Sequence, residues 1–234
     1  MIEIQNVTKK YGDKKALKNV SFEVGNGEIF AFIGHNGAGK TTLIKAIMGI
    51  HDFDEGDILI NGKSIKKEPV ACKKEMAYVP DNPELYENMK AIDFINFICD
   101  MYEIPQDERE KNIKKYAKAF EIEENLGDVI SSFSHGMKQK VALIAALSHN
   151  PKVLVMDEPF VGLDPKAVFD MKEIMKKMVK DGKTIFFSTH ILDVAEKLCT
   201  RVAIIKKGEL VKVGSMRTVK GDKSLEKIFL ELEK

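Results

Sequence analysis

Residues 34–41 combine residue types and a spacing that could bind the phosphates of a nucleotide. They read Gly-His-Asn-Gly-Ala-Gly-Lys-Thr and fit the pattern G-x-x-x-x-G-K-[ST]. Glycines let such a loop turn without side chains that block the phosphates, and the N-terminus of a following helix adds fixed positive potential. The residues that we predict to contact the nucleotide here are Gly34, His35, Asn36, Gly37, Ala38, Gly39, Lys40, Thr41 and Thr42.

A second chemical pattern follows the apolar residues 153–156, which end in Asp157 and Glu158. A buried strand delivers its last residue to the edge of the sheet, where ligands of open α/β sheets bind. Asp157 is then suited to hold Mg²⁺ opposite Thr41, and Glu158 to orient or deprotonate an attacking water. Acidic residues end many strands, so the pattern is weak alone; after a phosphate loop in the same chain it is strong.

The hydrophobic pattern predicts the elements that position these residues. The apolar run 28–33 predicts a buried strand before the loop, and residues 42–48 open a helix after it. Further strands are predicted at residues 2–7, 16–24, 57–60, 76–79, 153–156, 184–188 and 202–205. The pattern is helical from about residue 90 to 150, then behind the N-cap Asp164, between the last two strands, and from Leu225 to Leu232. We therefore expect an α/β nucleotide fold interrupted by an all-helical insertion of roughly 60–70 residues.

Composition limits the function classes. The 234 residues, 44% hydrophobic and 31% charged, suffice for one domain with a sizeable insertion. The net charge of +1 gives no global field that attracts nucleic acid or an anionic membrane. Cys72, Cys99 and Cys199 lack the spacing of a zinc site or a disulfide framework, which favours reduced, cytosolic thiols. No signal peptide or run of 18 apolar residues is apparent, so we expect no membrane span.

Further motifs resemble those of the ATP-binding cassette (ABC) ATPases. Residues 134–140, Ser-His-Gly-Met-Lys-Gln-Lys, resemble the signature sequence, whose usual form is Leu-Ser-Gly-Gly-Gln. Tyr11-Gly12 is similar to the adenine-stacking loop of that family, residues 162–165 to its D-loop and residues 188–190 to its switch-histidine segment. The motifs occur in the family's order over nearly the whole chain. The resemblance implies an α/β P-loop NTPase (RecA-like) core with an antiparallel β subdomain and an inserted all-helical subdomain.

The resemblance also implies a division of the chain and roles for single residues. Residues 1–234 would form one ABC ATPase domain, with the core in 1–81 and 151–234 and the signature in the helical subdomain 82–150. Lys40 would pair with the β- and γ-phosphates, His190 would contact the γ-phosphate beside the catalytic Glu158, and Tyr11 would stack on adenine. Two simpler interpretations stay open: Tyr11 as an aromatic residue of a surface turn, and His190 as a histidine that merely ends a strand.

In this family each ATP lies between two subunits. Ser134 would cap a helix whose N-terminus points at the γ-phosphate held by the partner. The other nucleotide contacts implied at that interface are His135, Gly136 and Asp164. The resemblance therefore implies a head-to-tail dimer.

Three positions depart from the family pattern. Asp81 stands where a Gln normally links Mg²⁺ to the membrane-facing helices, and we hypothesise that its carboxylate still senses the metal. The alternative is a turn residue after Pro80. His135 and Met137 replace Gly and Gln in the signature; His135 either adds a titrating charge near the phosphates or is an exposed neutral side chain.

These variant motifs resemble the ATPase subunits of ABC-2-type and Ecs-type exporters. The resemblance implies ATP and Mg²⁺ as cofactors, a second ABC ATPase subunit in a homodimer or heterodimer, and an integral membrane permease that docks around residues 81–102. It implies a cytoplasmic protein held on the inner face of the cell membrane through that permease, with no nucleic acid partner. The alternatives are the ATPase of an importer and a soluble cassette ATPase that acts on DNA or ribosomes.

Overall fold

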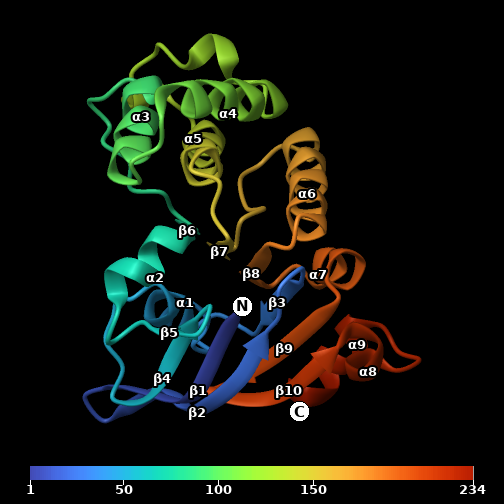
Figure 1. The fold of residues 1–234 in the computed structure, drawn as a ribbon. Helices are drawn as coiled ribbons and strands as arrows, with labels where there is room; N and C mark the ends of the chain where they lie inside the picture. The colour runs from blue at the N-terminus through green and yellow to red at the C-terminus, as the bar shows by residue number, and fades with distance from the viewer. Residues whose placement is uncertain (234) are drawn as a thin grey trace.

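Two β-sheets form the base of the molecule, and the computed structural model describes residues 1–233 (Figure 1). The strands are β1 (Ile2–Tyr11), β2 (Lys14–Val24), β3 (Ile29–Ile33), β4 (Glu55–Ile60), β5 (Lys63–Ser64), β6 (Met76–Val79), β7 (Val153–Asp157), β8 (Thr184–Thr189), β9 (Arg201–Lys206) and β10 (Glu209–Ser215). The smaller sheet is antiparallel, in the order β2-β1-β4-β5. The larger sheet has the order β10-β9-β3-β8-β7-β6 and is parallel from β9 to β6, with β10 antiparallel at its edge.

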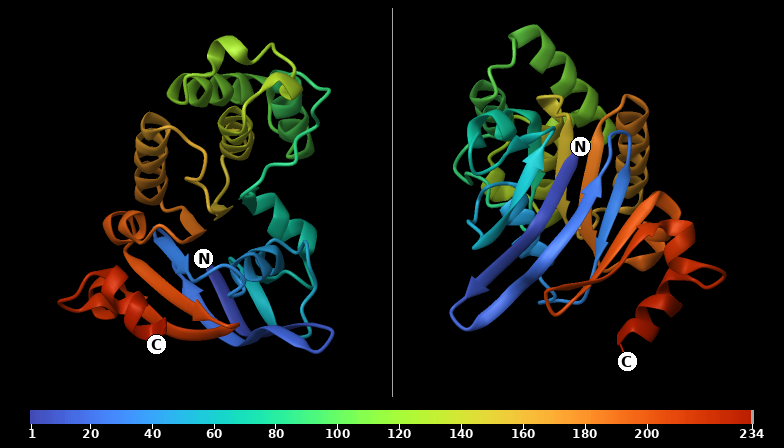
Figure 2. Two further views of the ribbon diagram at one scale, coloured as in Figure 1. Left: turned by 180° about the vertical axis from the view of Figure 1, so that it is seen from behind. Right: turned by 60° about the horizontal axis from the view of Figure 1, so that its bottom comes forward.

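Two groups of helices lie at different places around the sheets. The helices are α1 (Lys40–Ile47), α2 (Pro69–Glu75), α3 (Ala91–Met101), α4 (Gln106–Ala119), α5 (His135–Ser148), α6 (Pro165–Lys180), α7 (Leu192–Leu198), α8 (Met216–Lys220) and α9 (Leu225–Glu233), with short 3-10 turns at Glu123–Asn125 and Ile130–Ser132. Helices α3, α4 and α5 gather at one end, above the sheets, whereas α8 and α9 lie beside β9 and β10 (Figures 1 and 2). The chain thus leaves the larger sheet after β6, builds three helices and returns as β7, which pairs with β6.

This arrangement confirms the predicted fold class, and each predicted strand and helix is present. Helix α1 begins at Lys40, two residues before the predicted start. The sequence prediction missed β5, α2, β10 and α8. These elements are short or mostly polar, and hydrophobic periodicity is a weak signal over so few residues. The division at residues 81/82 and 150/151 stays a prediction.

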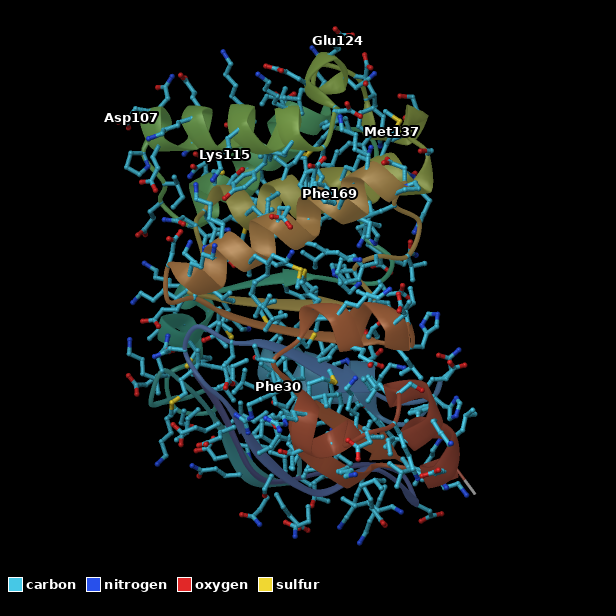
Figure 3. All side chains as sticks on the ribbon, turned by 90° about the vertical axis from the view of Figure 1, so that its right-hand side faces the viewer. Phe30, Asp107, Lys115, Glu124, Met137 and Phe169 are labelled. Carbon is cyan, nitrogen blue, oxygen red and sulfur yellow. The ribbon has the colours of Figure 1, made fainter. Side chains whose placement is uncertain are left out.

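An aromatic cluster fixes the strand that carries the phosphate loop. Phe22 of β2 stacks on Phe30 of β3 with ring centroids 5.3 Å apart, and Phe186 of β8 lies 5.9 Å from Phe30. Phe32 of β3 completes the cluster, and Phe30 is shown within the molecule in Figure 3. Each such contact contributes about 0.5–1.5 kcal/mol beyond its buried area. The smaller sheet therefore packs through Phe22 on β3 and β8 of the larger sheet, and this packing supports the strand that precedes the loop.

Among the described residues, no helix combines the length and the apolar character needed to cross a membrane.

Candidate functional site

The phosphate loop lies between β3 and α1 and borders a cavity of about 400 Å³. Gly39 has a φ of 113°, and a Cβ there would lie 2.7 Å from the carbonyl oxygen of Ala16. Gly37 has a φ of 77°. Both conformations favour glycine, and the first also leaves no room for a side chain. The local sequence therefore forms a tight turn whose backbone lines the cavity.

Lys40 places its ammonium group at the centre of this turn. Its Nζ donates to the carbonyl oxygen of Gly34 at 2.6 Å and to that of His35 at 3.4 Å. The same Nζ lies 3.5 Å from Oε1 of Glu158, and the Lys40 side chain is only 6% exposed. A buried cation with neutral carbonyl partners and one carboxylate is well placed to attract an anionic group.

Thr41 and Asp157 meet as expected at the carboxyl end of β7. The Thr41 hydroxyl donates to Oδ2 of Asp157 at 2.6 Å, and the hydroxyl of the buried Ser188 donates to the other carboxylate oxygen. Among residues 1–233, no three His, Cys, Asp or Glu side chains are grouped as a metal site by themselves. Mg²⁺ usually takes one or two protein oxygens and completes its shell with phosphates and waters. The oxygens of Thr41 and Asp157 fit this mode of Mg²⁺ coordination.

Asp81 also lines the cavity. Burial raises the pKa of its carboxyl group, the negative charges of Asp157 and Glu158 raise it further, and His135 and His190 oppose them. A bound cation would relieve the repulsion between these carboxylates. The electrostatics at Asp81 therefore fit a site for a divalent ion.

Glu158 combines an unusual backbone angle with a buried side chain. Its φ is 47°, a left-handed conformation that costs a non-glycine residue of order 1–3 kcal/mol and clusters at functional sites. Its Oε2 lies 2.9 Å from Nδ1 of His190 and accepts the His190 backbone N–H at 3.2 Å. Its Oε1 is buried and has no hydrogen-bond partner among the described residues. This oxygen faces Lys40 and can accept a proton or a hydrogen bond from a ligand.

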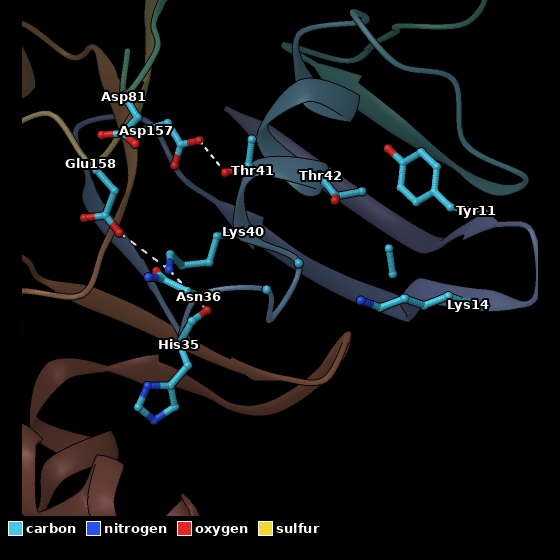
Figure 4. A pocket seen from close by; sticks show the side chains of 13 residues that line it. Tyr11, Lys14, His35, Asn36, Lys40, Thr41, Thr42, Asp81, Asp157 and Glu158 are labelled. Carbon is cyan, nitrogen blue, oxygen red and sulfur yellow. Dashed lines mark hydrogen bonds and ion pairs between the residues drawn. The ribbon is translucent and has the colours of Figure 1, made fainter.

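Tyr11 lies across the cavity from the carboxylates (Figure 4). Its ring is 47% exposed, and its hydroxyl is 3.0 Å from Nδ1 of His51. Lys14 and Ala16 of β2 line the cavity beside it.

Sequence reasoning did not name Lys14, Ala16, His51 or Ser188 as site residues. One signal for Lys14 existed: Tyr11-Gly12-Asp13-Lys14 joins two strands as a tight turn, and the structure pairs Tyr11 with Lys14.

The signature residues Ser134, His135 and Gly136 are not among the residues that line this cavity, and neither is Asp164. Ser134 accepts the backbone N–H of Met137 at 3.3 Å and so caps α5. Asp164 caps α6 by accepting from Ala167 at 2.8 Å. The ammonium of Lys140, 2.7 Å from Asp164, holds the pKa of that carboxyl below its usual range.

The two segments that hold these residues touch each other. A Cβ at Gly136 would lie 2.6 Å from the carbonyl oxygen of Gly162. The side chain of the exposed His135 also packs against Gly162. The structure therefore brings the signature and the D-loop together at one surface, apart from the cavity.

The larger sheet is parallel, and its strand β3 is followed by the glycine-rich loop and helix α1. The carboxylate of Asp157, at the end of β7, accepts a hydrogen bond from Thr41 of that helix. These features define a P-loop nucleotide-binding protein. The model of the ABC transporter family matches residues 17–161. The chain belongs to that family, and it is an ATP-binding, ATP-hydrolysing subunit of a transporter.

Three relatives illustrate the range of the family. EcsA, an ABC-type transporter ATP-binding protein of Bacillus subtilis, is 34% identical over 100% of this chain and 97% of its own length. LnrL, the linearmycin resistance ATP-binding protein of Bacillus subtilis, is 35% identical over 92% of this chain and 69% of its own length. MetN, the methionine import ATP-binding protein of Clostridioides difficile, is 35% identical over 99% of this chain and 74% of its own length.

Solved structures agree with this assignment. The structure of an ATP binding subunit of an ABC transporter matches with a TM-score of 0.96 and 33% identity, covering 100% of both chains. A dimeric ATP-binding cassette in a post-hydrolysis state, bound to ADP and Pi, matches with a TM-score of 0.85 and 27% identity over 93% of this chain and 99% of that one.

Proposed function

We propose that the cavity binds ATP with Mg²⁺ and that hydrolysis there drives an exporter by opening and closing a dimer of two such subunits. The observation that carries the proposal is Glu158, whose buried carboxylate lies between Lys40 and His190. One oxygen of this carboxylate has no hydrogen-bond partner among the described residues and lies 3.5 Å from the ammonium of Lys40, so it is suited to take a proton from an attacking water.

The neighbouring residues would divide the remaining tasks. Lys40 and the loop backbone would hold the β- and γ-phosphates, and Tyr11 would stack on adenine. Thr41 and Asp157, with Asp81 facing them, would hold Mg²⁺, which when bound offsets the negative charge of the phosphates. His190 would keep the Glu158 carboxylate in place through its contact at 2.9 Å and would reach the γ-phosphate.

The second subunit would complete the site. Ser134, His135 and Gly136 lie at the N-terminus of α5, and Ser134 and His135 are exposed. A helix N-terminus of this kind attracts an anion. Together with Asp164 at the neighbouring D-loop, it would face the γ-phosphate of a partner, as a homodimer or a heterodimer. The dimeric structure of a related cassette supports this arrangement.

A membrane permease would dock at the junction of β6 and α3. A mostly apolar cavity of about 220 Å³ lies there and is lined by residues that include Leu85, Phe94 and Ile98. Tyr86 packs edge-on against Phe97 with ring centroids 5.8 Å apart, although Tyr86 is 58% exposed and Phe97 39%. Aromatic residues that stay exposed are typical of protein interfaces. The subunit would then lie on the cytoplasmic face of the cell membrane.

The direction of transport rests on relatives and variant motifs. The signature Ser-x-Gly-Met-Lys-Gln-Lys and Asp81 favour an exporter, and LnrL is a resistance protein. The alternative is an importer, because MetN covers nearly the whole chain at similar identity. Purification with the permease and transport into inverted vesicles would separate the two.

The substitution Glu158→Gln tests the mechanism. It keeps the shape of the side chain but removes its basicity, so we expect ATP hydrolysis to fall about 10²- to 10⁴-fold while ATP binding persists. With excess ATP and Mg²⁺ the variant should elute as a dimer in size-exclusion chromatography. Glu209→Gln, at an exposed ion pair with Lys18, is the control for loss of one charge. A Glu158→Gln protein that stays monomeric with ATP would contradict the proposed dimer closure.

A further inference from the structure

The C-terminal helix packs against the outer side of the phosphate loop. The imidazole of His35 points away from the cavity and towards the C-terminal part of the chain (Figure 4). There the ring of Phe229 in α9 lies with its centroid 4.7 Å from that of His35, at an interplanar angle of 56°. Phe229 is only 7% exposed, whereas His35 is exposed, so the His35 ring covers Phe229 at the surface. The sequence predicted that His35 would contact the nucleotide, yet its side chain packs on α9.

The backbone of His35 faces the opposite way and holds the loop together. Its carbonyl oxygen accepts the N–H of Ala38 at 3.1 Å and lies 3.4 Å from Nζ of Lys40. Gly34, the preceding residue, packs so closely on β9 that a Cβ would lie 2.6 Å from the carbonyl oxygen of Ile205. The ring of His35 is thus held on the outside of the loop, while its carbonyl oxygen lies inside the loop. There it is the second acceptor of Lys40, at 3.4 Å, after the carbonyl oxygen of Gly34 at 2.6 Å.

Helix α9 is itself tied to the elements that border the site. The N–H of Leu225 donates to Oε2 of Glu196 in α7 at 2.8 Å, and Lys220 holds Oε1 of the same carboxylate at 2.5 Å. Helix α7 begins two residues after His190. At the other end, Nζ of Lys206 in β9 donates to the carbonyl oxygen of Leu232 at 2.8 Å. Both ends of α9 are thus held, one by α7 and one by β9, the strand on which Gly34 packs.

We propose that Phe229 is a positioning residue for the phosphate loop: it holds His35 so that the loop backbone and Lys40 are pre-organised for the phosphates of ATP. The inference rests on the proposed binding of ATP at this loop. Pre-organisation reduces the ordering cost of binding, so its loss weakens ATP binding. Glu158 and His190, which do the chemistry, keep their own contacts. The Kd and KM for ATP therefore rise, while kcat changes little.

The test compares Phe229→Ala with Ile228→Ala. Both residues are buried in α9, at 7% and 8% exposure, but Phe229 contacts His35. We expect Phe229→Ala to raise the Kd for ATP about 2- to 12-fold, the equivalent of an aromatic contact of about 0.5–1.5 kcal/mol. Phe229→Leu, which refills most of the volume, should recover part of the affinity and serves if the alanine variant fails to fold.

Binding to the wild-type protein is measured first, with a fluorescent ATP analogue. Wild-type protein that binds no ATP would overturn the proposed function itself. If the wild type binds, an unchanged Kd in Phe229→Ala, or an equal loss in Ile228→Ala, overturns the positioning role alone. His35→Ala combined with Phe229→Ala provides a further check, because residues that act through one contact are not additive. Additive effects on the Kd would refute the link.

Discussion

Ser188 connects two of the acidic residues of the site, Asp157 and Glu158, and its hydrogen bonds give the size of the stability loss expected when it is replaced. Its hydroxyl donates to the Asp157 carboxylate and accepts the N–H of Glu158 at 3.1 Å, and the residue is fully buried. Ser188→Ala leaves a buried charged acceptor without this donor. Hydrogen bonds to charged groups contribute about 1.5–3 kcal/mol, so the free energy of unfolding should fall by that amount. For a chain of this size the melting temperature should fall by about 3–12 °C.

A matched control is available in Ser148, the last residue of α5. It is also fully buried, but its hydroxyl oxygen has no hydrogen-bond partner among the described residues. Ser148→Ala makes the same chemical change and removes an unsatisfied polar group, so it should be neutral or stabilising. Thermal unfolding followed by circular dichroism measures both variants. Equal destabilisation by the two substitutions, or none by Ser188→Ala, would refute the assignment of stability to these hydrogen bonds.

Two further predictions concern Tyr11, which lines the nucleotide cavity, and His149, which is buried beside β6 and lies outside that cavity. Tyr11→Ala should weaken ATP binding by about 1–3 kcal/mol, the contribution of an aromatic ring stacked on a base. Tyr11→Phe keeps the ring and loses only the hydrogen bond to His51, so it should bind ATP almost as well as the wild type. A binding titration in which both variants lose the same affinity would argue against stacking. Burial lowers the pKa of His149 in the folded protein from 6.5 to about 4. As the pH falls, the unfolded chain therefore takes up the proton first. The free energy of unfolding decreases below pH 6.5 and stops decreasing below pH 4, where both states are protonated. Between pH 7 and pH 5 this loss is about 2 kcal/mol, and His149→Phe should remove it; a pH dependence of denaturant unfolding that is the same in both proteins would exclude His149 as its source.

The phosphate loop and the strand and helix beside it could be predicted from short motifs, because each motif is local in the sequence. The glycines of the phosphate loop, the strand before it and the helix after it are contiguous, so their types and spacing carry the geometry. Ser134 and Asp164 were likewise predicted as helix caps, since a cap is decided within a few residues, and both accept the expected backbone N–H. The fold class followed from the same kind of signal, repeated along the chain.

Contacts between distant segments could not be predicted from one sequence. Ser188 lies 31 residues from Asp157, and Phe229 lies in a different element from His35. Nothing in the local pattern around Phe229 distinguishes it from an ordinary core residue of an amphipathic helix. Its partner is decided by where the topology places α9, beside β9 and under the loop.

The same reasoning explains why the site residues separate into two groups. Lys40 and Thr41 begin α1 after β3, whereas Asp157 ends β7 and Glu158 follows it. Both β3 and β7 pair in parallel with β8, so the fold brings these four residues to the same edge of the sheet. Ser134 begins a helix that belongs to the group above the sheet, and its position follows from how α3, α4 and α5 pack on one another. The signature begins α5 and does not line the cavity of its own chain. The N-terminus of this helix attracts an anion, so the cavity of a partner copy placed against it would use both groups of residues in one site.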